Sequence, residues 1–193
     1  MFKIKFRIVD DLEILKTVES NWFDANYNKI EGFIEVCFGQ HKEGCYYHEG
    51  PLQEGEIGGE LLNYWIDKLL DVANMLQTTS YCAFKEIETT NRWLEFKLVE
   101  NKVTINVAID TEGRNKGLLI AESYDGFQYA EPVDFSVELN ILNNEIRFSV
   151  KRFLAELEKI NPKLLKSQMV SDIAKKGSQI QHHNERSEVH GRD

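Results

Sequence analysis

Long apolar runs and basic charge are both scarce in this sequence. No stretch approaches the roughly eighteen apolar residues of a membrane-spanning helix, so we expect no contact with the membrane interior. The formal net charge is -9 at pH 7. Because phosphate binding requires a basic surface, we also expect no nucleic acid among the partners. A basic protein is the partner that this charge favours.

Cysteine is rare too, with three residues in the chain. An odd number of cysteines favours a reducing compartment over a disulfide scaffold. The start, MFKIKFRIVDD, lacks the continuous apolar segment and the small-residue cleavage site of a signal peptide. We therefore expect a cytoplasmic protein.

Familiar catalytic motifs are missing. The chain has no phosphate-binding glycine loop, no Gly-x-Ser-x-Gly elbow and no His-Glu-x-x-His pair. Carboxylates such as Glu49, Glu54, Glu56 and Glu60 could form a general acid–base pair. They stand in a Gly-rich connection that is more typical of a solvated loop or an acidic contact surface. We predict no enzyme activity, no catalytic residues and no cofactor.

Periodicity predicts the strands. In FKIKFRIVD, apolar and charged residues alternate with the period of two that marks a half-buried strand. Short connections separate the later candidates, which favours antiparallel hairpins. The further strand candidates are GFIEVCFG, SYCAFKEI, RWLEFKLVE, KVTINVAID, LLIAES and VDFSVEL.

Two segments change to the period of an amphipathic helix. They are EGEIGGELLNYWIDKLLDVANMLQ, beginning near Gly58 and Gly59, and NNEIRFSVKRFLAELEKINP, which Asn143 or Asn144 could cap. The order of elements predicts an α+β domain over residues 1–161, a mainly antiparallel β-sheet with two helices on one face. We expect residues 162–193 to form a tail, partly helical and then disordered after Gly177. The oligomeric state stays open.

The stretch CFGQHKEGCYYHEG holds four side chains that zinc prefers, namely Cys37, His41, Cys45 and His48. Their spacing departs from that of structural zinc sites, which bring a tight Cys-x2-4-Cys turn to a separate His pair. A hairpin with a half-buried cysteine and surface histidines is therefore the favoured interpretation. A metal-binding domain built on these four residues is the alternative function.

Aromatic side chains are interleaved with acids in WFDANYNKIEG, in ESYDGFQYAEP and around the hairpin at residues 37–50. Aromatic anchors next to acids are typical of surfaces that bind a basic protein. The partner-binding residues predicted on this basis are Trp22, Asp24, Tyr27, Glu43, Tyr46, Glu49, Tyr124, Asp125, Phe127 and Tyr129. The competing interpretation is that these aromatic residues cover the edges of the core.

Together, the acidic balance, the absence of a catalytic motif and GFIEVCFG leading into GELLNYWIDKLLDV give residues 1–160 a general likeness to a known group of proteins. The chain resembles the small acidic immunity-type proteins of bacterial polymorphic toxin loci. The resemblance implies a stoichiometric inhibitor that occludes a toxin, often a nuclease with a basic cleft. It assigns no individual residue. A scaffold domain within a larger assembly is a further alternative.

Overall fold

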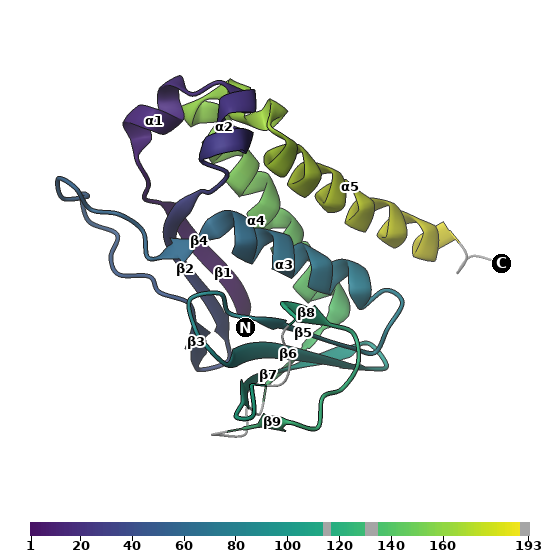
Figure 1. Cartoon of the computed structure of the whole chain (residues 1–193). Helices are drawn as coiled ribbons and strands as arrows, with labels where there is room; N and C mark the ends of the chain where they lie inside the picture. Colours follow the sequence, from purple (N-terminus) through teal and green to yellow (C-terminus); the bar gives the residue numbers. More distant parts are fainter. Residues whose placement is uncertain (114–116, 130–134, 190–193) are drawn as a thin grey trace.

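The computed structural model describes residues 1–113, 117–129 and 135–189, and for residues 181–189 it describes the backbone alone. The chain is an α+β protein with antiparallel sheets, which confirms the predicted class (Figure 1). Its strands are β1 (Phe2–Ile8), β2 (Glu31–Phe38), β3 (His41–Glu43), β4 (Glu60–Leu61), β5 (Tyr81–Lys85), β6 (Arg92–Val99), β7 (Lys102–Asp110), β8 (Leu119–Ile120), β9 (Phe127–Gln128) and β10 (Ser136–Glu138). Its helices are α1 (Leu12–Thr17), α2 (Ser20–Asn26), α3 (Leu62–Met75), α4 (Leu139–Ile160), the 3-10 helix η1 (Pro162–Lys166) and α5 (Gln168–Val189).

The strands form two sheets rather than the single sheet that was predicted. Sheet A runs β1-β2-β3, and β4 also pairs with β2. β3 pairs with Val36–Phe38 of β2, whereas β4 pairs with Glu31 and Gly32 of the same strand. Sheet B runs β10-β7-β6-β5-β8, with β9 against β7, and contains the expected β5–β7 meander.

The prediction of two helices on one face was incomplete, because the described residues form five α-helices. α3 contacts both β2 and β5, so it joins the two sheets, while α4 lies along β1. The edge of β1 is closed by α4, since the backbone N–H of Ile4 donates to Glu145 Oε1 at 2.9 Å. One main apolar core extends through both sheets and these helices.

The start of α4 differs from the prediction. Asn143 and Asn144 do not cap it, because the helix begins at Leu139, and Asn143 is 2% exposed inside it. Leu139 N–H donates to the carbonyl of Asn101 at 2.8 Å, and Leu142 is fully buried in the main core. Burial of this first turn overrides the capping preference of asparagine.

Residues after 161 were expected to form a tail, but η1 and α5 add Leu164, Val170, Ile173 and Ile180 to the main core. Gly177 does not end α5. A Cβ at this glycine would lie 3.2 Å from Val150 Cγ1 and 4.0 Å from Leu70 Cδ2, so its absence lets α5 pack closely on α4 and α3. Of the segment after Gly177 that was predicted to be disordered, residues 178–189 continue α5, and residues 190–193 lie outside the description. No helix in the described ranges combines the length and apolar character that crossing a membrane requires.

Candidate functional site

The connection between β3 and β4, residues 44–59, is the longest connection within sheet A that contains no helix, and it is called here the β3–β4 loop. It leaves and returns on the same side of β2, because β3 and β4 both pair with that strand. Figure 1 shows it projecting on the left, away from α5. Its sequence contains Glu49, Glu54 and Glu56 and neither lysine nor arginine.

Backbone contacts hold the base of the loop. Gly58 N–H donates to the carbonyl of Val9 at 2.8 Å, and Ile34 N–H donates to the carbonyl of Cys45 at 2.9 Å. Gly58 packs so closely on β2 that an added Cβ would lie 2.1 Å from the nitrogen of Gly32. The two ends of the loop are therefore fixed against sheet A.

The first part of the loop folds over the outer face of sheet A. Phe33 points to that face and is nevertheless fully buried, because the rings of Tyr46, Tyr47 and His48 lie 6.0, 5.1 and 5.6 Å from its centroid. Arg7 donates to the carbonyl of Gly50 at 2.6 Å. The loop is thus held by an aromatic cluster and by a guanidinium beneath it.

The outer part of the loop carries two apolar side chains and several carboxylates. Tyr47 is 66% exposed and Ile57 is 67% exposed. Glu56 is hydrogen-bonded to Gln53 N–H at 2.8 Å and to His48 Nε2 at 2.7 Å, and these two contacts lower the pKa of its carboxyl. Glu56 is therefore ionised at neutral pH.

Lys5 offsets part of the acidic charge of the loop. Its Nζ lies 3.4 Å from Glu49 Oε1 and 4.8 Å from the ring centroid of Tyr46. A hydrogen bond from Tyr46 and the nearby Lys5 keep the pKa of the Glu49 carboxyl below its ordinary value. Glu54, near the exposed tip, carries its charge outward.

Beneath the loop lies a buried group that we call the carboxyl cluster: Glu43, Glu60 and Glu86, with Arg92. The three glutamates are 6%, 6% and 5% exposed. Arg92 binds Glu43 with two hydrogen bonds, from Nε at 2.7 Å and from a terminal nitrogen at 2.6 Å. Trp65 Nε1 donates to Glu60 at 2.7 Å. Glu43 and Glu60 are the residues just before and just after the β3–β4 loop.

Burial raises the pKa of Glu86 to about 8, and the neighbouring Glu43 carboxyl acts in the same direction. Arg92 opposes this effect, but its Nε is 3.6 Å from Glu86 Oε1 and already donates to Glu43. Burial likewise raises the pKa of Glu60. The raised pKa of Glu86 favours its protonated form at neutral pH. Since each carboxyl is less than a tenth exposed, the cluster favours a structural role.

The predicted partner-binding residues lie in three separate places. In α2, Trp22 is 49% exposed beside an apolar hollow lined by Ile14 and Val18. Asp24 is a structural residue, since its Oδ2 accepts from Gln168 N–H, at the start of α5, at 2.8 Å. The half-buried Tyr27 donates to Asp10.

The second place is the loop and its anchor, where Tyr46 and Glu49 lie in the β3–β4 loop. The prediction for Glu43 as a surface contact is wrong, because its carboxyl is buried against Arg92.

The third place is the outer face of sheet B, where the chain from Tyr124 to Tyr129 covers a small second core. The prediction for Phe127 as a contact residue is also wrong, because it is 7% exposed and lies 5.4 Å from the ring of Trp93. Tyr129 donates to the fully buried Glu95 at 2.9 Å. Tyr124 is half-buried, and Asp125 is exposed.

The four candidate metal ligands are not brought together. Cys37 donates to Glu35 at 3.1 Å, His41 stacks on Phe38, and His48 contacts Glu56. Within the described residues, no group of three or more His, Cys, Asp or Glu side chains is placed to hold a metal ion. Burial raises the pKa of both Cys37 and Cys45, which disfavours their thiolates.

Sequence reasoning missed Glu86, Glu95 and Arg92. Glu43 belongs to sheet A, and Glu86 and Arg92 of the sheet B segment meet it only where the two sheets pack together, for which no local pattern exists. The place of Glu95 could have been recognised from the sequence, since it stands between Leu94 and Phe96 in a strand and faces away from the main core.

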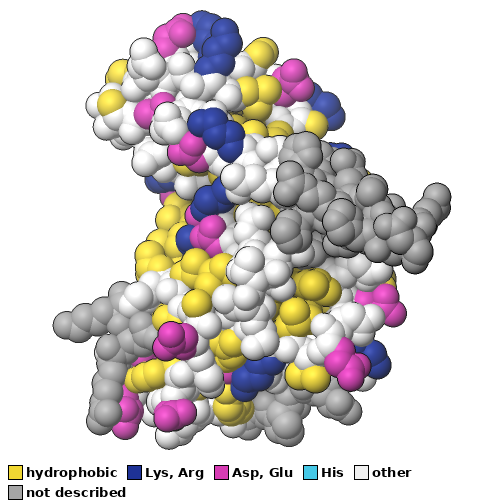
Figure 2. Space-filling view, turned by 90° about the vertical axis from the view of Figure 1, so that its right-hand side faces the viewer, with side chains coloured by type: hydrophobic (Ala, Val, Ile, Leu, Met, Phe, Trp, Pro, Cys, Tyr) yellow, Lys and Arg dark blue, Asp and Glu magenta, His cyan; other side chains and the backbone are white. Residues whose placement is uncertain are grey.

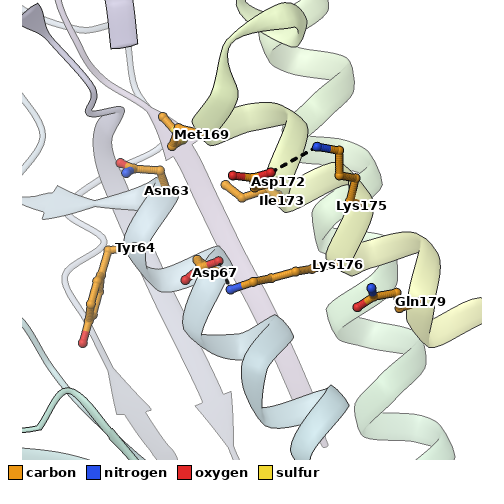
Figure 3. Close-up of a pocket in the computed structure, with 9 residues that line it drawn as sticks. All are labelled: Asn63, Tyr64, Asp67, Met169, Asp172, Ile173, Lys175, Lys176 and Gln179. Carbon is orange, nitrogen blue, oxygen red and sulfur yellow. Dashed lines mark hydrogen bonds and ion pairs between the residues drawn. The ribbon is translucent and has the colours of Figure 1, made fainter. Parts of the chain in front are cut away.

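A second hollow, of about 470 Å³, lies between α3 and α5. Figure 3 shows Lys176 of α5 reaching Asp67 of α3, a contact of 2.5 Å, and the same ammonium lies 2.7 Å from Asp71.

On the face drawn in Figure 2, acidic and basic side chains are interspersed, without a broad area of one sign. The acidic and basic charges of this face offset one another, in contrast to the acidic tip of the β3–β4 loop.

No family model, curated protein or solved structure matches this chain.

Proposed function

We propose that this chain is a non-catalytic binding protein, an inhibitor of the immunity type, that holds a basic protein partner through the β3–β4 loop. The observation that carries this proposal is the exposure of Tyr47 and Ile57 beside the carboxylates of this loop. The loop itself is held in place by its contacts with sheet A.

Each property of the loop has a role in binding. Carboxylates such as Glu54 attract a basic partner over a distance and raise the rate of encounter. The exposed Tyr47 and Ile57 lose their contact with water in the complex, which slows dissociation. Because the base of the loop is already ordered, less conformational entropy is lost on binding.

The cysteines fit the proposed cytoplasmic location. Cys37, Cys45 and Cys82 are all free thiols. A protein kept in a reducing compartment does not need a disulfide. A bacterial toxin with a basic active-site cleft is the partner that the charge of the loop suits.

The test is binding of the full chain to the purified product of the adjacent gene, measured by biolayer interferometry. Ile57→Ala is expected to weaken binding about tenfold or more, as expected for a central contact residue. Val99→Ala is the matched control, since Val99 is 69% exposed at the end of β6. It is expected to leave binding unchanged.

Charge is tested separately with Glu49→Gln combined with Glu54→Gln. The association rate is expected to fall several-fold at low salt, and the difference is expected to vanish near 0.5 M NaCl, where charges are screened. The proposal fails if the wild-type chain does not bind at micromolar concentration, or if Ile57→Ala and Val99→Ala have equal effects.

A further inference from the structure

The carboxyl cluster connects the β3–β4 loop to sheet B. Glu43 belongs to β3, whereas Arg92 begins β6 and Glu86 follows β5. The bidentate contact between Glu43 and Arg92 thus joins the first end of the loop to the other sheet. At the second end, Glu60 of β4 accepts from Trp65 of α3. Both ends of the loop are therefore attached through buried carboxyl groups.

The charges in this cluster do not balance when every carboxyl is ionised. Glu86 faces Glu43 from β3, Glu60 from β4 and Arg92 from β6, and its charge also reaches the thiol of Cys45 in the loop. Glu88 lies close enough to act on Glu60. Among these neighbours Arg92 is the cation, and both of its nitrogens that contact Glu43 are already donating.

The position of Glu86 is therefore suited to a neutral carboxyl. Its Oε1 is buried and has no hydrogen-bond partner in the described part of the chain. An ionised oxygen in that place would be desolvated next to the negative charge of Glu43, which is costly. A protonated Glu86 can instead share its proton with Glu43, and this contact is compatible with the Glu43–Arg92 pair.

We propose that the proton held between Glu43 and Glu86 fastens the β3–β4 loop to sheet B, and that its loss at alkaline pH loosens the loop. Repulsion between two adjacent carboxylates pushes Glu43 away from Arg92 and with it the start of the loop. The functional meaning of this device rests on the proposed role of the loop in binding.

Amide hydrogen exchange measured by NMR tests the device without any partner. The reporters are the N–H groups of Gly58 and Ile34, whose hydrogen bonds hold the base of the loop. Dividing each rate by the intrinsic rate of an unfolded peptide removes the direct effect of hydroxide. Amides of the β6–β7 ladder report on opening of the whole domain.

Between pH 6.5 and pH 9.0 the protection of Gly58 and Ile34 is expected to fall roughly ten- to thirtyfold, because the closed state binds the Glu86 proton more tightly than the open state does. At both pH values these amides are expected to be less protected than those of the β6–β7 ladder. In Glu86→Gln, which stays neutral, the fall is expected to disappear. Glu158→Gln, at an exposed position of α4, is the control and should retain it.

Glu43→Gln is the second variant, to be used if Glu86→Gln does not fold. It leaves Arg92 free to pair with Glu86, so the alkaline fall is expected to disappear in this variant too. The proposal is overturned if loop protection is the same at both pH values in the wild type. It is also overturned if the loop amides are as protected as the β6–β7 ladder, because the loop then does not open separately. Either result leaves the binding proposal to its own test against the adjacent gene product.

Discussion

Asn161 offers a sharp test of how the C-terminal part of the chain is attached. Its side chain is 4% exposed and lies between α4 and η1. Nδ2 donates to the carbonyl of Leu15 at 3.0 Å and to that of Val18 at 2.8 Å, and Oδ1 accepts from Lys163 N–H at 3.0 Å. One amide group thus joins the end of α1 to the start of η1.

The magnitude for Asn161→Ala follows from these three contacts. Each lost hydrogen bond between a side chain and a buried carbonyl costs about 1 to 1.5 kcal/mol. Loss of the cap on Lys163 N–H costs about 1 kcal/mol more. The free energy of unfolding is therefore expected to fall by about 3 to 4 kcal/mol. For a chain of this length, that corresponds to a decrease in Tm of roughly 10 °C.

Urea unfolding followed by tryptophan fluorescence measures the loss. Asn161→Asp is the informative second variant, because it keeps Oδ1 but replaces the donor by an oxygen that faces two carbonyls. It is expected to cost at least as much as the alanine variant. Asn144→Ala removes an exposed asparagine in α4 that contacts Arg147, and is expected to change stability by less than about 0.5 kcal/mol. A loss in Asn161→Ala no larger than in this control would refute the reasoning.

Two further substitutions test packing and charge. Gly58→Ala should lower the free energy of unfolding by about 3 kcal/mol in urea titrations, because the new Cβ meets the backbone of Gly32 at 2.1 Å. Gly50→Ala should be close to neutral, because the atom nearest to its new Cβ is 3.5 Å away. Equal stabilities of the two variants would contradict this account. Lys176→Met should cost about 1 kcal/mol at low salt and less in 1 M NaCl, because the ammonium joins α5 to Asp67 and Asp71 of α3. Lys175→Met removes a more exposed ion pair within α5 and should cost less, and the reverse order would count against the inter-helix role.

Local patterns predicted those elements whose burial follows their own periodicity. The alternation in FKIKFRI appears directly as β1, with Phe2, Ile4, Phe6 and Ile8 buried. The helical period likewise located α3, although the helix starts at Leu62 rather than at the preceding glycines. In both elements the core-facing residues lie in one continuous segment, so no information from elsewhere in the chain was needed.

The predictions failed where distant segments decide the outcome. Phe33 lies on the outer face of sheet A, opposite to Ile34, and no pattern indicated that Tyr46 and Tyr47 would cover it. Gly177 suggested the end of a helix, yet it marks the close contact of α5 with α4. The local sequence around Glu43 is that of an exposed acid in a hairpin. Its burial depends on Arg92, which is 49 residues away in the chain and donates to its carboxyl. Each of these roles depends on long-range packing.

The same long-range packing bears on how binding by the loop has to be measured. Tyr47 is exposed, but one side of its ring covers Phe33 at a centroid distance of 5.1 Å. Removing that ring would uncover an apolar side chain and loosen the loop, so a weaker complex would combine two effects. Ile57 is equally exposed and follows Glu56, whose contacts with Gln53 and His48 keep the tip in place without it. A change in affinity at Ile57 therefore reports on the partner contact itself.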